Sequence, residues 1–182
     1  MKSPSRLASL LLAAFALGAL ALTVSACGYE SDSKEVVEGE VVKLGDLKYQ
    51  VIFSRFLNIH DNEDASYLVG QPPPQDGSNY FGVFLEVQNK SEETQTLADS
   101  FSIEDADRVT YDAIPSESLY AFPAGGKVES QEPVPTPDST PQQGPIEGSL
   151  VLFELPETAS QNRPLTLSIP GPGGPAEVTL DL

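Results

Sequence analysis

The feature that most constrains the fold is a series of short segments in which apolar and polar residues alternate, separated by turns rich in proline and glycine. In the clearest segment, at 80–88, one face carries Phe81, Val83, Leu85 and Val87, and the other carries Tyr80, Gly82, Phe84, Glu86 and Gln88. A period of two is typical of a β-strand with one face in a core. The chain has 16 prolines and 14 glycines and no clear amphipathic helix, so we expect an all-β fold.

Further segments follow the same rule. At 47–54, Leu47, Tyr49, Val51 and Phe53 are expected to face the core, and Lys48, Gln50 and Ser54 to face water, with Ile52 as an exception. The nearly continuous apolar run at 150–153 predicts a central strand that is covered on both faces. Segments at 165–169 and 178–182 predict a hairpin around the turn at 171–175. Shorter strands are expected at 41–44, around Phe101 and Ile103, and at 109–112.

The remaining stretches predict loops. The acidic patch at 61–64 and the proline run at 71–77 are read as loops, with a brief strand at 67–69 between them. The segment 115–124 is irregular, with Leu119, Tyr120 and Phe122 as apolar anchors, and 156–164 suits one helical turn. Residues 131–145 include five prolines and predict a long exposed loop. Many short strands favour an antiparallel β-sandwich, and a closed barrel is the alternative.

The N-terminus has the layout of a secretory leader. Lys2 and Arg6 charge its start, residues 7–24 carry no charge, and the small residues Ser25 and Ala26 precede Cys27. This order is typical of a signal peptide, and its ending on cysteine resembles a bacterial lipoprotein signal. Residues 1–26 are therefore predicted to be the signal peptide. In this interpretation the peptidase recognises Val24, Ser25 and Ala26, and Cys27 receives lipid.

An uncleaved membrane helix is the competing interpretation, because the apolar run is just long enough to span a bilayer at ~20 residues. Two features argue against it. Gly18 and the Ser25-Ala26 pair suit a peptidase, and the run is followed by acids such as Glu30 rather than by a basic cluster. We therefore expect a lipid-anchored protein on the extracytoplasmic face of the cell membrane.

The net charge limits the partners that the protein can bind, and the single cysteine limits how its fold can be stabilised. The whole chain carries a formal charge of −17, and loss of Lys2 and Arg6 with the leader brings it to −19. Such acidity opposes binding to nucleic acid or to an anionic membrane surface. Cys27 is the only cysteine, so no internal disulfide can form, and the core must hold by packing.

The mature chain divides into a tether and one domain. Residues 27–38 are small, polar and acidic, and predict a flexible tether; the alternative is an edge strand that begins at Val36. Residues 39–182 are long enough for one domain with a core of its own.

Four segments carry a resemblance to a known family. These are Gly45–Val51, Tyr80–Ser91 with its large apolar strand and polar Asn89-Lys90-Ser91 turn, Phe101–Asp105, and Gly148–Pro156. Together they resemble an immunoglobulin-like domain of unknown function that is common in lipoproteins of Gram-positive bacteria. That family is similar in turn to secreted immunoprotective extracellular β-sandwich proteins. The resemblance implies an immunoglobulin-like sandwich, but no shared catalytic residue and no cofactor.

Candidate chemical groups are few. His60, the only histidine, is expected to lie exposed in a loop beside Asp61, because no nucleophile motif or second metal-binding histidine accompanies it. The acidic groups at 61–64 and 104–107 lack the ligand spacing of a calcium loop and are read as solvated turns. The following aromatic residues could line a ligand face, but are read as packing residues: Tyr67, Tyr80, Tyr111, Tyr120 and Phe122.

The sequence thus favours a non-catalytic binding module without metal or cofactor, whose partners are an envelope protein, a polymer or a small ligand. The alternative is an extracytoplasmic hydrolase that uses acidic residues. The loops at 61–77 and 131–145 are the expected contact regions, and the competing view is that both are inert spacers.

Overall fold

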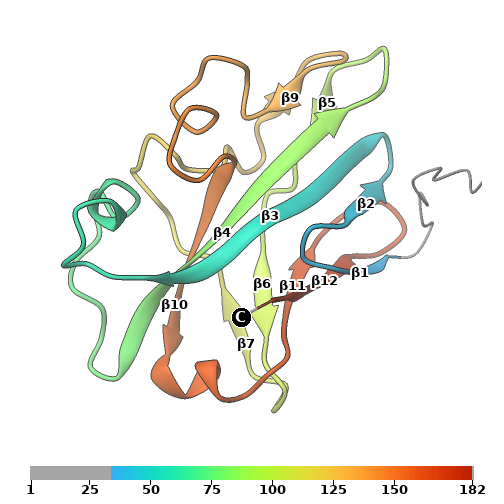
Figure 1. Ribbon diagram of the computed structural model, residues 1–182. Coiled ribbons are helices and arrows are strands. Elements are labelled where there is room, and N and C mark those ends of the chain that lie inside the picture. The colour runs from blue at the N-terminus through green and yellow to red at the C-terminus, as the bar shows by residue number, and fades with distance from the viewer. Residues whose placement is uncertain (1–33, 182) are drawn as a thin grey trace, which may run out of the picture.

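A computed structural model describes residues 34–181. They form an all-β sandwich in which two sheets pack around a shared core (Figure 1), which confirms the predicted fold class. The strands are β1 (Glu35–Val37), β2 (Val41–Leu44), β3 (Leu47–Leu57), β4 (Ser78–Asn89), β5 (Gln95–Thr96), β6 (Ser102–Glu104), β7 (Thr110–Asp112), β8 (Lys127–Val128), β9 (Pro133–Val134), β10 (Ser149–Pro156), β11 (Leu165–Ile169) and β12 (Ala176–Leu180). Two 3₁₀ turns, η1 (Asp64–Ser66) and η2 (Glu157–Ser160), complete it.

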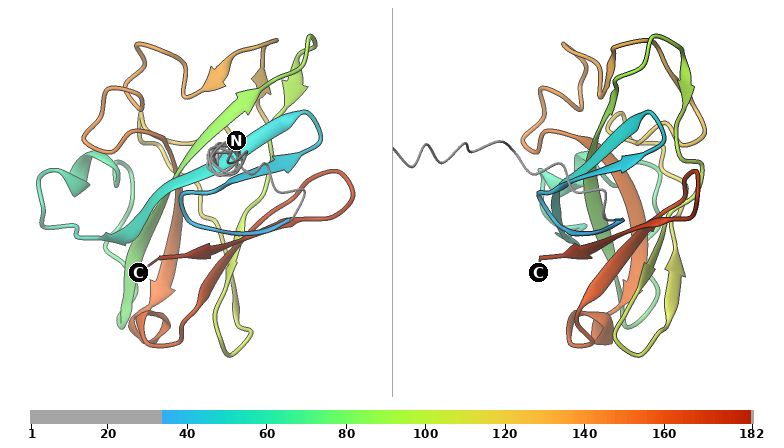
Figure 2. Two further views of the ribbon diagram at one scale, coloured as in Figure 1. Left: turned by 45° about the vertical axis from the view of Figure 1, so that its right-hand side comes forward. Right: turned by 90° about the vertical axis from the view of Figure 1, so that its right-hand side faces the viewer.

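One sheet has the order β10-β4-β3-β2, and we call it the β4 sheet; the other has the order β1-β12-β11-β6-β7, and we call it the β11 sheet. All pairs in them are antiparallel except β1 with β12. Figure 2 shows the strands of both sheets in two views turned by 45° and 90° from that of Figure 1.

Strand β4 is covered on both faces. As predicted, Phe81, Val83, Leu85 and Val87 lie together in the core between the sheets. Tyr80 and Phe84, on the opposite face, belong to a second buried cluster with Leu57, Tyr67, Leu68, Leu150 and Leu152. The second cluster exists because the segments that follow β3 and β7 cover the outer face of the β4 sheet. Side chains on both faces of β4 are therefore buried.

The second half of β3 departs from the predicted alternation. Val51 pairs with Leu85, but Phe53 pairs with Phe84, so Ile52 is an extra residue that forms a β-bulge. A bulge reverses the faces of the residues that follow it. Consequently Phe53 is 42% exposed and Ser54 is buried, the opposite of the expectation. The Ser54 hydroxyl donates to the Glu38 carboxylate at 2.6 Å.

The ordered domain begins before residue 39. β1 pairs in parallel with β12, with Val36 opposite Val178, and Val36 is buried in the core. The alternative of an edge strand near Val36 is therefore the one that the structure shows, and the prediction of a flexible tether is wrong for residues 35–37. Burial of Val36 and pairing with the exposed edge of β12 give this short segment a fixed place.

Strand β10 is buried on both faces as predicted, but it is not central in its sheet. It pairs with β4 on one side only. Its other edge is covered by the irregular segment 113–122, in which the Ile114 N–H donates to the Leu152 carbonyl at 2.8 Å and the Phe122 N–H to the Leu150 carbonyl at 2.7 Å. These bonds satisfy the Leu150 and Leu152 carbonyls on the edge of β10, although no full strand pairs with it.

The loops partly follow the sequence interpretation. Residues 71–77 are a surface loop as predicted. Residues 67–69 form no strand, because Tyr67 ends η1 and its side chain is buried.

The irregular segment 115–124 has one of its expected apolar anchors exposed. Leu119 is 78% exposed and is not an anchor, whereas Phe122 is buried. The predicted loop at 131–145 contains β9, which pairs with the end of β4. The helical turn at 157–160 and the β11–β12 hairpin are confirmed.

Candidate functional site

The predicted lipidation site lies outside the described residues. This holds for Cys27 and for Val24, Ser25 and Ala26, which precede it. Among residues 34–181, no helix is both long and apolar enough to cross a membrane. The lipid anchor therefore stays a prediction of the sequence.

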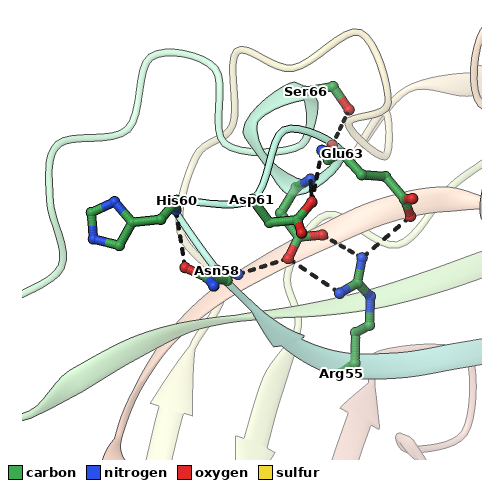
Figure 3. A network of polar contacts seen from close by, with 7 residues as sticks. Arg55, Asn58, His60, Asp61, Glu63 and Ser66 are labelled. Atoms are coloured by element: carbon green, nitrogen blue, oxygen red, sulfur yellow. Dashed lines mark hydrogen bonds and ion pairs between the residues drawn. The ribbon is translucent and has the colours of Figure 1, made fainter.

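His60 lies in the loop that follows β3, and its side chain is exposed, as predicted (Figure 3). Its backbone N–H donates to the Asn58 side-chain oxygen at 2.9 Å. Within residues 34–181, no three His, Cys, Asp or Glu side chains are grouped so that they could hold a metal ion.

The acidic patch at 61–64 is not simply a solvated turn. Asp64 is buried, and its carboxylate pairs with the Arg55 guanidinium and accepts from the Asn58 N–H at 2.7 Å. Glu63 lies 3.6 Å from the same guanidinium. We call residues 58–68 the pinned loop, because Asp64 fastens it to β3. The prediction of a solvated turn is wrong for Asp64, because Arg55, nine residues earlier, supplies a cation that pairs with it. The acidic composition of residues 61–64 does not show this partner.

The acidic group at 104–107 is likewise anchored through one member. Asp105 is buried, and its carboxylate accepts from the N–H groups of Val109 and Asp107 and from the Tyr111 hydroxyl, at 2.9–3.0 Å. The Val109 N–H is the largest cause that lowers the pKa of Asp105. Burial, followed by the bond to Asp105, raises the pKa of Tyr111. These bonds close the β6–β7 turn, so the prediction of a solvated turn is wrong for Asp105.

Most of the candidate aromatic residues pack, as predicted. Tyr67 makes edge-to-face contacts with Phe84 and Tyr120, and the Tyr80 hydroxyl donates to the Pro72 carbonyl at 2.8 Å. Phe122 packs on Phe101 with ring centroids 5.2 Å apart. Phe122 differs from the others because it also lines a cavity.

That cavity is a cleft of about 530 Å³ between the β7 edge of the β11 sheet and the β10 edge of the β4 sheet. We call it the edge cleft. It is lined by residues of four segments, 99–101, 112–116, 121–124 and 150–152. Its volume lies within the range of small-molecule sites, ~300–1,000 Å³.

The edge cleft exists because the chain crosses between the sheets after β7. The Ala113 N–H donates to Phe101 of the segment before β6 at 2.9 Å, and the Ile114 N–H then donates to β10. The chain leaves β10 after Ile114, runs over the surface at 117–119, and returns to β10 at Phe122, so an opening remains between the two crossings. One wall is held from outside, because the Gln71 side chain donates to the Pro115 carbonyl at 2.8 Å.

The deep part of the edge cleft is apolar, and its rim is acidic. Phe101, Phe122 and Leu152 are buried and give it an apolar floor, whereas Asp99 and Asp112 are exposed. Asp99 accepts a bond from the Ser100 hydroxyl at 3.1 Å, and Asp112 makes no side-chain hydrogen bond within residues 34–181. An apolar floor with carboxylates at the rim suits a molecule that has an apolar body and a positively charged group.

Sequence reasoning did not identify the edge cleft. Its lining comes from four segments that no local pattern connects, and Asp99 and Asp112 are ordinary surface acids in the sequence. The nearest signal was the irregular segment 115–124 itself, since irregular chain beside strand edges often forms the walls of a site.

Comparison with solved structures supports the sandwich. The chain is similar to an uncharacterized β-sandwich protein from Clostridium difficile, with 15% identity, a TM-score of 0.51, and coverage of 82% of this chain and 95% of that one. It is also similar to the yjhA protein from Bacillus subtilis, with 15% identity, a TM-score of 0.53, and coverage of 80% and 99%. Likeness at this identity shows the fold alone.

No protein-family model and no curated protein matches the sequence. The immunoglobulin-like assignment therefore stays a prediction, and the fold is established as a β-sandwich.

Proposed function

We propose that this protein is a lipoprotein anchored through Cys27 to the extracytoplasmic face of the cell membrane, and that it binds a small ligand in the edge cleft without catalysis. The observation that carries the binding role is the edge cleft itself, with its buried apolar floor and its exposed carboxylates. The leader that ends on Cys27 supports the anchor.

The anchor is tested by mass. The mature protein extracted from membranes should begin at Cys27 and carry a diacylglyceryl group, because a single acyl chain holds a protein only weakly. The Cys27→Ser variant should lose the lipid, and it should either be released or remain an unprocessed precursor. A wild-type protein whose mature N-terminus is not a lipid-bearing Cys27 contradicts the proposal.

The ligand proposed for the edge cleft is a small amine with an apolar body. Carboxylates at a rim attract a cation, and the formal charge of −19 on the mature chain strengthens that attraction at low salt. The apolar body of the ligand would leave water by lying against the floor of the cleft, to which Phe101 and Phe122 contribute. The rest of the ligand can be a free solute or the end of an envelope polymer.

Calorimetry with two matched probes tests the ligand class. Cyclohexylamine and cyclohexanol have similar apolar bodies, and only the amine carries a charge. Residues 27–182 with Cys27→Ser should bind the amine more tightly, and Asp99→Asn with Asp112→Asn should remove most of that preference. Asp76→Asn in the 71–77 loop is the matched control and should change nothing. Equal binding of both probes, or an equal loss in the control, contradicts the proposal.

A hydrolase is the second candidate, and the observation that favours it is that two carboxylates line one cleft. A carboxyl that acts as a general acid at neutral pH needs burial or a like charge close by, and both carboxylates are exposed. This favours binding over hydrolysis. Cleavage of chromogenic glycosides by the wild type, abolished by Asp112→Asn, would support the hydrolase instead.

A further inference from the structure

The chain that leads from Cys27 into the sandwich is held in place from Lys34 onward. Within it, the Lys34 ammonium donates to the carbonyls of Pro172 and Gly174 in the β11–β12 turn, at 2.9 and 2.8 Å, and β1 then pairs with β12. At the far end of β1, the Glu38 carboxylate accepts from both the backbone N–H and the hydroxyl of Ser54. The chain therefore enters the sandwich at one defined place, the β11–β12 turn.

The distance between that place and the lipid is short. Seven residue steps separate Cys27 from Lys34, and fully extended chain covers at most about 25 Å in that number of steps. A lipid on Cys27 thus keeps the β11–β12 turn within about 25 Å of the bilayer surface, whereas parts of the sandwich at its other end can lie much farther away.

All five lysines of the mature chain lie at the same end of the sandwich as this turn. Contacts between neighbouring turns connect them. Gly45 of the β2–β3 turn and Pro172 line the same small pocket, and Lys43 and Lys48 face each other just beside that turn. The Lys90 N–H donates to Asp46 at 3.3 Å, the Gln95 side chain also reaches Asp46, and Lys127 pairs with the next residue, Thr96. These turns gather at the right and upper right of Figure 1.

Acidic residues share this end and are at least as numerous as the lysines, so it is not basic; they include Asp46, Glu92, Glu93, Glu129 and Glu132. The rest of the sandwich holds the three arginines Arg55, Arg108 and Arg163 against a larger number of acids. The charge is therefore asymmetric, and the lysine end is the part of this acidic protein that an anionic bilayer repels least.

We propose that the end of the sandwich formed by the β2–β3 and β11–β12 turns is a bilayer-facing surface, fixed by the Lys34 anchor and favoured by the five lysines. This inference rests on the lipidation of Cys27 proposed above. The β6–β7 turn and η2, at the bottom of Figure 1, then point away from the membrane. The β6–β7 turn is joined to the segment just after η2, because the Ala106 N–H donates to the Asn162 carbonyl at 3.2 Å.

Fluorescence quenching in vesicles tests this orientation. The lipidated full chain is labelled at Pro172→Cys or at Ala106→Cys, two exposed and uncharged positions at opposite ends. Cys27 does not react, because its sulfur carries the lipid. A lipid with a nitroxide at its headgroup should quench the label at position 172 severalfold more than the label at position 106. The ratio of the two quenching values should rise when phosphatidylglycerol is mixed into phosphatidylcholine, because the anionic surface repels the lysine end least.

Matched charge variants test the role of the lysines. Lys43→Gln with Lys90→Gln should remove most of the dependence on phosphatidylglycerol, and Arg108→Gln with Arg163→Gln, which deletes the same charge elsewhere, should leave it intact. Lipid on Cys27 with equal quenching of the two labels overturns the orientation alone. A mature chain without lipid overturns the anchor and this inference together, while the edge cleft keeps its own calorimetric test.

Discussion

The pinned loop and the edge cleft both bring acidic and aromatic side chains to the outside of the sandwich, but these groups have different surroundings. In the pinned loop, Asp64 is buried against Arg55 and Tyr67 packs on Phe84. In the edge cleft, Asp112 is exposed without a side-chain partner within residues 34–181, and the face of Phe122 borders open space. A carboxylate that is already paired internally, such as that of Asp64, stabilises a fold, whereas groups left facing a cavity can bind something else.

The largest expected effect is in the pinned loop. Arg55→Ala leaves the Asp64 carboxylate buried without its cation, and should lower the free energy of unfolding by about 2–4 kcal/mol. Urea unfolding of residues 27–182 with Cys27→Ser measures it. Arg108→Ala, at an exposed turn, is the control and should change stability by less than about 0.5 kcal/mol. A similar small change for Arg55→Ala would mean that the loop is not held by this pair.

The next effect concerns pH and Asp105. The pKa of Asp105 is lowered in the folded protein from its ordinary value of 3.8. The unfolded chain therefore binds more protons between the two pKa values, and the stability due to Asp105 is complete above pH 3.8 and is lost as the pH falls through the folded pKa.

Asp105→Asn tests this dependence. The variant should be less stable than the wild type at neutral pH, and the difference should shrink as the pH falls below 3.8. Thermal unfolding across this pH range is the measurement, and Asp107→Asn in the same turn is the comparison. A stability difference that does not change with pH would show that the contribution of Asp105 to stability does not depend on the charge of its carboxylate.

The smallest expected effect on stability is in the edge cleft. Asp112→Asn should change the free energy of unfolding by less than about 0.5 kcal/mol, because the carboxylate is exposed and loses no internal contact. Urea unfolding checks it against Arg55→Ala. A loss of more than about 1 kcal/mol would make Asp112 a structural residue like Asp64 and would erase the difference between the two regions.

The sequence predicted the parts of the fold that depend on local pattern. Val83, Leu85 and Val87 alternate and are buried together, and the turn at 171–175 forms the predicted hairpin. The errors arose where one residue or one distant partner decides the outcome. The bulge at Ile52 reverses Phe53 and Ser54, and the local pattern marked Ile52 only as an apolar exception, not as an extra residue.

The candidate site was less predictable for the same reason. Whether Asp64 is solvated depends on Arg55 across a loop, and the edge cleft depends on where the chain crosses from one sheet to the other after Asp112. The predicted contact loops are also more constrained than their composition indicates. Tyr80 and Gln71 fasten the 71–77 loop, and Pro133 and Val134 pair with β4.

The most direct test of the account is a map of where a small amine binds. Cyclohexylamine is titrated into isotope-labelled residues 27–182 with Cys27→Ser, and the shifts of backbone amide signals in NMR spectra are followed. We expect the largest shifts at Ser100, Ala113, Ala121 and Val151, which surround the edge cleft, and their loss in Ala121→Phe, which fills it. Shifts concentrated in the pinned loop or at 131–145, or spread evenly over the acidic surface, would contradict the assignment of the edge cleft as the binding site.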